Sequence, residues 1–144
     1  MSVKPIDRRA QEDLRAFVWT GAGIASLVAD KPVDLRREIN GELSLVIEAR
    51  VDAGTTDFVG LAMLSDLSDG KASQSTPTNI LGALRAVPKG TWATIAVPLR
   101  CLLSAGSDPT RIGSPFALVS SGKLALTISD IRVESVAQPT LRCP

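Results

Sequence analysis

Residues 43–52, LSLVIEARVD, alternate between apolar and more polar side chains. Because successive residues of a β-strand point to opposite faces of a sheet, this alternation predicts a strand with one buried face. The dipeptide Asn40-Gly41, which favours a tight turn, lies shortly before it. The residues expected on the buried face are Leu43, Leu45, Ile47, Ala49 and Val51.

Short runs rich in Val, Ile, Leu and Thr, separated by Gly, Pro, Asp and Asn, predict further strands along the chain. The run at 58–64 is apolar on both faces, which indicates a central strand covered on each side. Pro98 restricts the strand at 91–99 to a sheet edge or a strand end, because proline has no N–H to donate. The other expected strands lie at 16–20, 116–120 and 124–136.

The last of these strands changes register part-way along. Its apolar residues alternate up to Ile128, but the next apolar residue is Ile131. We expect a β-bulge at Ser129-Asp130, because one extra residue there returns the later apolar side chains to the buried face.

The pattern as a whole is all-β, with about seven to nine strands and no convincing long helix. This content is typical of an antiparallel β-sandwich or jelly roll, here expected over residues 15–144. Residues 1–14 are polar and are expected to form a linker or docking arm, in which Asp7 caps a short helix over Arg8–Arg15. The polar segment Ser65–Thr78 is predicted to be a long surface loop.

Composition excludes several function classes. The chain of 144 residues has no histidine, which removes Ser-His-Asp and Cys-His catalysis and histidine-ligated zinc. A net charge of +1 is too balanced for a dedicated partner of nucleic acid or of an anionic membrane. The N-terminal residues lack an apolar h-region, so we expect no signal peptide on this chain itself. These absences favour a binding or structural module over an enzyme.

Several short motifs, in this order, resemble the C-terminal domain of bacterial family 3 glycoside hydrolases of the ExoP type, which are exo-acting β-glucosidases and β-glucanases. The motifs are Gln11-Glu-Asp13, Phe17-Val-Trp19-Thr-Gly21, Val33-Asp-Leu-Arg-Arg-Glu38, Asn40-Gly-Glu-Leu43, Glu48-Ala-Arg50-Val-Asp52, Gly90-Thr-Trp92, Val97-Pro-Leu99-Arg-Cys101, Ala105-Gly-Ser-Asp108, Ser114-Pro-Phe116, Ser121-Gly-Lys-Leu124, Ile128-Ser-Asp-Ile131 and Cys143-Pro144.

This resemblance implies a galactose-binding-like jelly roll that follows two catalytic domains. It implies that the carboxylates of the parent glycosidase lie in those domains, and that the parent's signal peptide directs the protein to the periplasm or the exterior. We therefore expect a non-catalytic accessory domain that packs on the catalytic domains and contributes to binding of a β-glucan or oligosaccharide. Its Ser65–Thr78 loop is then expected at the rim of the active-site cleft. The alternative is an autonomous carbohydrate-binding module.

Five residues are candidates for contact with carbohydrate or with another domain. Trp19 and Trp92 offer ring faces to the C–H face of a sugar, although packing in the core or between domains is the alternative for both. The others are Glu48, Arg50 and Asp52, which line one strand face. The two carboxylates lie roughly 13 Å apart along the strand. Glycosidases hold theirs about 5–9.5 Å apart, so these two are a poor catalytic pair.

The two cysteines and two aspartates are candidates for structural roles. In the oxidising compartment that the resemblance implies, Cys101 and Cys143 form one disulfide; free thiols are the alternative. We expect no cofactor. A structural calcium ion is the alternative, for which Asp66 and Asp69 are candidate ligands although their spacing does not match an EF-hand loop.

Overall fold

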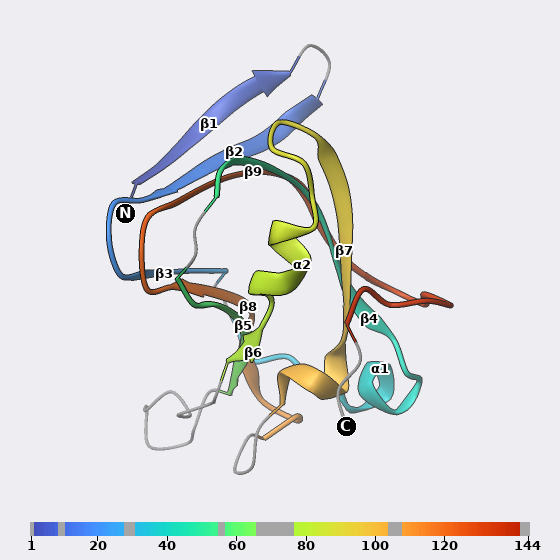
Figure 1. Ribbon diagram of the computed structural model, residues 1–144. Coiled ribbons are helices and arrows are strands. Elements are labelled where there is room, and N and C mark those ends of the chain that lie inside the picture. Colours follow the sequence, from blue (N-terminus) through green and yellow to red (C-terminus); the bar gives the residue numbers. More distant parts are fainter. Residues whose placement is uncertain are drawn as a thin grey trace.

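The computed structural model describes residues 2–8, 11–27, 31–54, 57–65, 77–103 and 108–141. These residues form two antiparallel sheets packed face to face, with sheet A arching over sheet B in Figure 1. Sheet A has the strand order β1 (Ser2–Arg8), β2 (Gln11–Trp19), β9 (Leu124–Glu134), β4 (Ser44–Ala53) and β7 (Trp92–Pro98). Sheet B has the order β3 (Gly23–Leu27), β8 (Ile112–Ser120), β5 (Val59–Ser65) and β6 (Thr78–Asn79). The predicted all-β antiparallel sandwich is confirmed.

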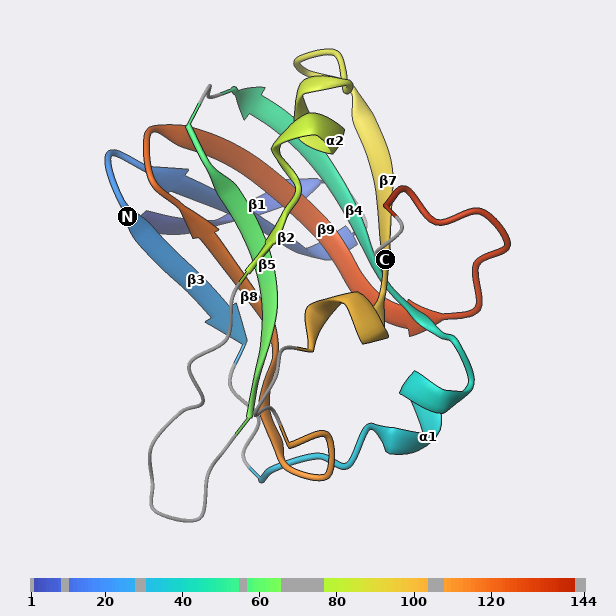
Figure 2. The same cartoon turned by 60° about the horizontal axis from the view of Figure 1, so that its bottom comes forward.

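Helical structure in the described residues is limited to single turns at the ends of the sandwich. Figure 2 shows the helices α1 (Arg36–Asn40) and α2 (Leu81–Arg85) at opposite ends. A 3-10 turn, η1 (Leu99–Leu102), follows β7 directly. None of the helices in the described part of the chain has the length and apolar character needed to cross a membrane.

The core lies between the two sheets. From β4 it receives the predicted row of Leu45, Ile47, Ala49 and Val51, while Leu43 packs against its margin. Sheet B supplies the opposing apolar side chains. They come mainly from the alternate residues of β5 and β8, namely Val59, Leu61, Met63, Ile112, Phe116 and Leu118. The period-two pattern therefore places the buried face as expected.

The bulge and the edge strand are also found as predicted. Glu48 pairs with Asp130 and the next residue, Ala49, pairs with Ile128, so Ser129 is the extra residue on β9. The strand β7 lies at the edge of sheet A, and Pro98 is its last residue.

A segment near the C-terminus bonds to β7 on the side away from β4. The backbone N–H of Thr140 donates to the carbonyl of Ala96 at 2.8 Å. The N–H of Ala96 donates in return to the Thr140 hydroxyl at 2.9 Å.

The prediction of a helix over Arg8–Arg15 is wrong. Its residues 11–15 belong to β2, which pairs with β9 on one side and with β1 on the other. The strand forms because β9 offers an unpaired edge, and the ladder hydrogen bonds to that edge outweigh the local capping signal of Asp7. A docking role for residues 1–14 stays a prediction.

Several predicted features fall outside the described residues. They are most of the Ser65–Thr78 loop, with Asp66 and Asp69, and Cys143. Cys101 lies half-buried in η1 against the core, and its sulfur is in a disulfide. The chain has Cys143 as its one other cysteine.

We predict that replacing both cysteines, as Cys101→Ser with Cys143→Ser, lowers the free energy of unfolding by about 4 kcal/mol. The reason is that a cross-link over this separation removes loop-closure entropy from the unfolded chain. Urea denaturation of the variant and of the oxidised, unsubstituted domain measures the difference. If both cysteines of the unsubstituted domain can be alkylated after unfolding without a reductant, the Cys101–Cys143 disulfide is contradicted.

Candidate functional site

Four of the five predicted contact residues lie together on the outer face of sheet A. Arg50 is paired in register with Trp92 of β7 and with Thr127 of β9, so the three side chains share this face. Glu48 is paired with Thr94 in the next outward row. We call this surface the polar face and define it by Glu48, Arg50, Asp52, Trp92, Thr94, Thr127, Asp130, Arg132 and Glu134.

Arg50 is the centre of one hydrogen-bonded group on the polar face. Its Nε donates to Asp52 Oδ1 at 2.6 Å, and its Nη2 donates to Thr127 Oγ1 at 3.3 Å. The Thr127 hydroxyl, fully buried, donates to Asp52 Oδ2 at 2.5 Å. The guanidinium carbon also lies 5.3 Å from the centroid of the half-buried Trp92 ring, within cation–π range. The hydrogen bonds to Asp52 and Thr127 thus hold the Arg50 guanidinium beside the Trp92 ring.

Arg132 holds together the other acidic groups of the polar face. Its guanidinium lies 2.8 Å from Asp130, 3.0 Å from Glu134 and 3.1 Å from Glu48. The hydrogen bonds to Glu134, Asp130 and Glu48 raise the pKa of Arg132 further above its ordinary value. Thr94 adds a hydrogen bond to Glu48 at 2.7 Å.

The two candidate carboxylates of strand β4 are held apart from each other on the polar face. Glu48 and Asp52 are each held by a different arginine, Arg132 and Arg50, and neither contacts the other. An acid–base pair needs two carboxylates aimed at one bond, and this arrangement does not provide it. Among the described residues, no three His, Cys, Asp or Glu side chains gather into a possible metal site.

Trp19, the fifth candidate, is part of the core. Only 1% of its surface is exposed, and its indole Nε1 donates to the carbonyl of Gly23 at 3.0 Å. Its ring stacks on Phe17 with the centroids 6.2 Å apart. Trp19 therefore faces the core, whereas Trp92 lies on the outer face of the same sheet.

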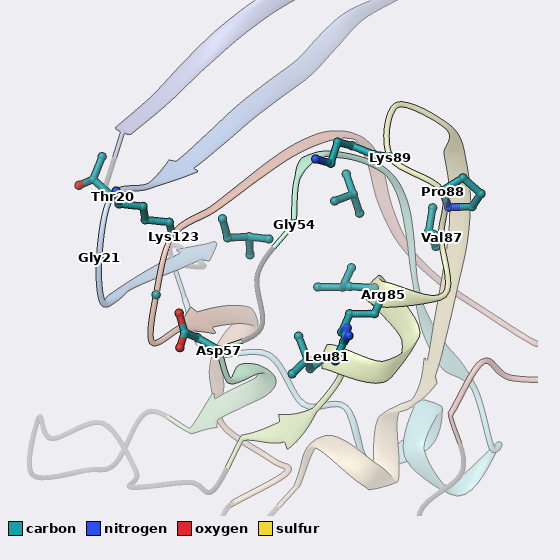
Figure 3. Close-up of a pocket in the computed structure, with 14 residues that line it drawn as sticks. Thr20, Gly21, Gly54, Asp57, Leu81, Arg85, Val87, Pro88, Lys89 and Lys123 are labelled. Atoms are coloured by element: carbon teal, nitrogen blue, oxygen red, sulfur yellow. The ribbon is translucent and has the colours of Figure 1, made fainter.

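A second site was not predicted from the sequence. It is a cavity of about 950 Å³ at the α2 end of the sandwich, which we call the end cavity (Figure 3). Its apolar lining includes Val51, Leu84 and Leu124. Polar side chains stand around it, with Lys123 and Asp57 on one side and Arg85 and Lys89 on the other (Figure 3). These residues come from separate turns, so no local motif in the sequence announces the cavity.

Asp57 is seated directly against the turn between β8 and β9. A Cβ placed on Gly122 would lie 1.8 Å from Asp57 Oδ2, so the carboxyl group occupies the space that any other residue would need. A larger residue at position 122 would therefore have to displace the Asp57 side chain. The Ser120 hydroxyl donates to the Gly122 carbonyl at 2.8 Å and fixes the same turn.

A family model described as galactose-binding domain-like, Exop_C, matches residues 1–133. The chain belongs to the Exop_C family. This match confirms the resemblance inferred from the sequence motifs. No curated protein gives a significant match to this Exop_C domain.

Solved structures similar to this Exop_C domain fall into two groups. The first group is the exo-1,3/1,4-β-glucanase ExoP from a Pseudoalteromonas species, at 20% identity, a TM-score of 0.66 and 92% coverage of this chain. The chain spans only 15% of that protein. The separately solved extra C-terminal domain of the same enzyme gives 20% identity and a TM-score of 0.65, with 92% of this chain and 68% of that one covered.

The second group consists of carbohydrate-binding modules. The family 30 module of a cellulosomal cellulase from Clostridium thermocellum gives a TM-score of 0.71 at 18% identity. The alignment covers 95% of this Exop_C domain and 83% of that module. At these identities the likenesses show the sandwich fold that the two groups share with this chain.

We predict that Thr127→Val destabilises this Exop_C domain by about 1–2 kcal/mol, because it removes a buried hydroxyl that bonds both Arg50 and Asp52. Thr94→Val is the matched control, since the same change at an exposed position should stay within about 0.5 kcal/mol. Urea denaturation measures both variants. Equal effects at the two positions would mean that the Arg50 group adds nothing to stability.

Proposed function

We propose that this chain is a non-catalytic accessory domain at the C-terminus of a secreted family 3 β-glucosidase or exo-glucanase. In this proposal it packs on the catalytic domains and contributes to polysaccharide binding. Membership of the Exop_C family supports it, and so does the likeness to one domain of a much longer glucanase. The carboxylates of the polar face are all held by arginines, which agrees with a role outside the chemistry.

The observation that carries the packing proposal is the composition of sheet B. None of the residues in its four strands is charged, whereas four of the five strands of sheet A carry charged residues. An antiparallel sheet with one face in water normally has polar residues on that face. Centres of protein interfaces, in contrast, are depleted of charge.

The outer face of sheet B has apolar side chains available for such an interface. Ile24 of β3 is 58% exposed and Phe58, just before β5, is 39% exposed. Phe58 and Pro77 pack over Gly60, where a Cβ would meet the Pro77 side chain at 2.5 Å. Catalytic domains that cover this face would bury Ile24 and Phe58 together.

We predict that Ile24→Arg weakens association of this domain with the catalytic domains of its parent enzyme by about tenfold or more, because a charge then enters the interface. Val133→Arg is the control, since Val133 is an exposed apolar residue of sheet A. Isothermal titration of the separately produced parts measures both affinities. Unchanged binding by Ile24→Arg would move the interface to another face.

The alternative, an autonomous carbohydrate-binding module, is favoured by the likeness to family 30 modules and by Trp92 on the polar face. A ring already fixed by Arg50 loses little conformational freedom when a sugar stacks on it. Neighbouring Asp52 and Glu48 offer acceptors for sugar hydroxyls.

Affinity electrophoresis of the isolated chain on laminarin, lichenan and cellulose tests this alternative. An autonomous module is retarded, and Trp92→Ala abolishes the retardation. Phe58→Ala, which removes an exposed aromatic ring from sheet B, serves as the control and keeps it. If the unsubstituted domain is not retarded on any of the three glucans, the alternative of an autonomous module is rejected and the packing role remains.

Two further expectations concern surroundings and ions. We propose a periplasmic or secreted location, which the disulfide at Cys101 supports, because such bonds persist in oxidising compartments. The alternative of a structural calcium ion stays a prediction, since Asp66 and Asp69 lie outside the described ranges.

A further inference from the structure

The end cavity gathers positive charge that the fold itself does not neutralise. Arg85 ends α2, Lys89 lies in the segment between α2 and β7, and Lys123 lies in the turn between β8 and β9. Throughout the described ranges, none of the three forms an ion pair with a carboxylate. Asp57 is the single acidic group among the described residues that line the cavity. The cavity therefore has an excess of positive charge.

Most of the other side chains that line the cavity are aliphatic. Val51, Leu84 and Leu124 are buried members of the core, and Leu81 packs against it. A volume of about 950 Å³ lies within the range of roughly 300–1,000 Å³ that is common for small-molecule sites. The described lining residues include no aromatic ring, which sets this cavity apart from a stacking platform for neutral glucan.

The positions of the charged side chains determine which side of the cavity attracts the anionic group of a ligand. Arg85 and Lys89 face the cavity from one side, while Asp57 and Lys123 stand on the other (Figure 3). An anionic group is attracted to the side with two cations and is repelled by the Asp57 carboxylate. Arginine also matches the planar, two-oxygen geometry of a carboxylate or sulfate group.

We propose that the end cavity binds an acidic saccharide, in which a uronate carboxylate or a sulfate ester lies against Arg85 and Lys89. The C–H face of the sugar lies on the aliphatic lining, and Lys123 adds to the positive field. The saccharide part of this inference rests on the proposed function, whereas the anionic part rests on the cavity alone. The site is separate from the polar face, because the two share no lining residue.

Isothermal titration of the full chain with glucuronate, glucose 6-sulfate, glucose and inorganic sulfate tests the proposal. Glucuronate or glucose 6-sulfate should bind at least about tenfold more tightly than glucose or inorganic sulfate. Affinity should fall as salt rises, because the attraction is between charges. Equal affinity for glucose would overturn the role of the cations, and equal affinity for inorganic sulfate would overturn the role of the sugar.

Three variants locate the binding. Arg85→Gln with Lys89→Gln should weaken binding of the acidic sugar by about tenfold or more, because it removes both cations that contact the anionic group. Gly54→Phe should do the same without changing charge, because open space lies within 4 Å of its Cβ position at the cavity. Lys31→Gln is the control: Lys31 lies next to the Val33–Ile112 bridge, at the end of β8 remote from Gly122. Binding that survives in the first two variants overturns the proposal.

Two outcomes separate this inference from the proposed function. If the domain binds its catalytic partner or β-glucan but no acidic sugar, the inference fails and the proposed function stands. If acidic sugars bind in the cavity while neither glucan nor the catalytic domains are bound, the proposed function fails instead. The catalytic domains could instead bind the unsubstituted domain and be released by Arg85→Gln with Lys89→Gln. In that case the cavity receives an acidic protein segment and the inference is wrong.

Discussion

The apolar contact between the inner faces of the two sheets determines where every other group in this domain lies. Along β4, burial of Leu45, Ile47 and Val51 forces the intervening residues outward. Arg50 then stands beside Trp92 and Thr127 because the strands pair in register. The polar face is thus a by-product of core packing, held in place by the same row of side chains.

The two outer faces of the sandwich have opposite chemistry. On sheet A, each carboxylate of the polar face has an arginine partner, and the ring of Trp92 is held by Arg50. On sheet B, charge is absent from the strands, and the exposed residues include the apolar Ile24 beside the neutral Ser26 and Asn79. The fold therefore separates a surface rich in ion pairs from a surface whose strands carry no charge.

The local sequence pattern correctly predicted the features that depend only on residues within one strand. The alternation of β4, the extra residue at Ser129 and the edge position signalled by Pro98 are all consequences of strand geometry within one segment. The second half of β2 was predicted as a strand at 16–20, but its first half was predicted as helix, because that part of the strand depends on its neighbours in the sheet, including β9 more than a hundred residues away. The local preference of Asp7 for a helix N-cap was outweighed by the hydrogen bonds between these strands.

The candidate site was predictable only in part, for the same reason. Glu48, Arg50 and Asp52 lie on one strand, so their common face followed from the sequence. Whether Trp19 or Trp92 is buried depends on which rows face each other across the sandwich. The end cavity joins turns that are distant in the chain, and Lys89 and Lys123 each look like ordinary turn residues until the fold brings them together.

The contact between Thr140 and Ala96 has a consequence for how the molecule behaves at high concentration. Unpaired N–H and C=O groups along an outer strand invite strands of other molecules to add on, which is how soluble sheets begin to aggregate. Thr140 occupies both backbone groups of Ala96 in the middle of β7, so a foreign strand would have to displace it first. The segment around Thr140 thus protects the β7 edge of sheet A against addition of a strand from another molecule.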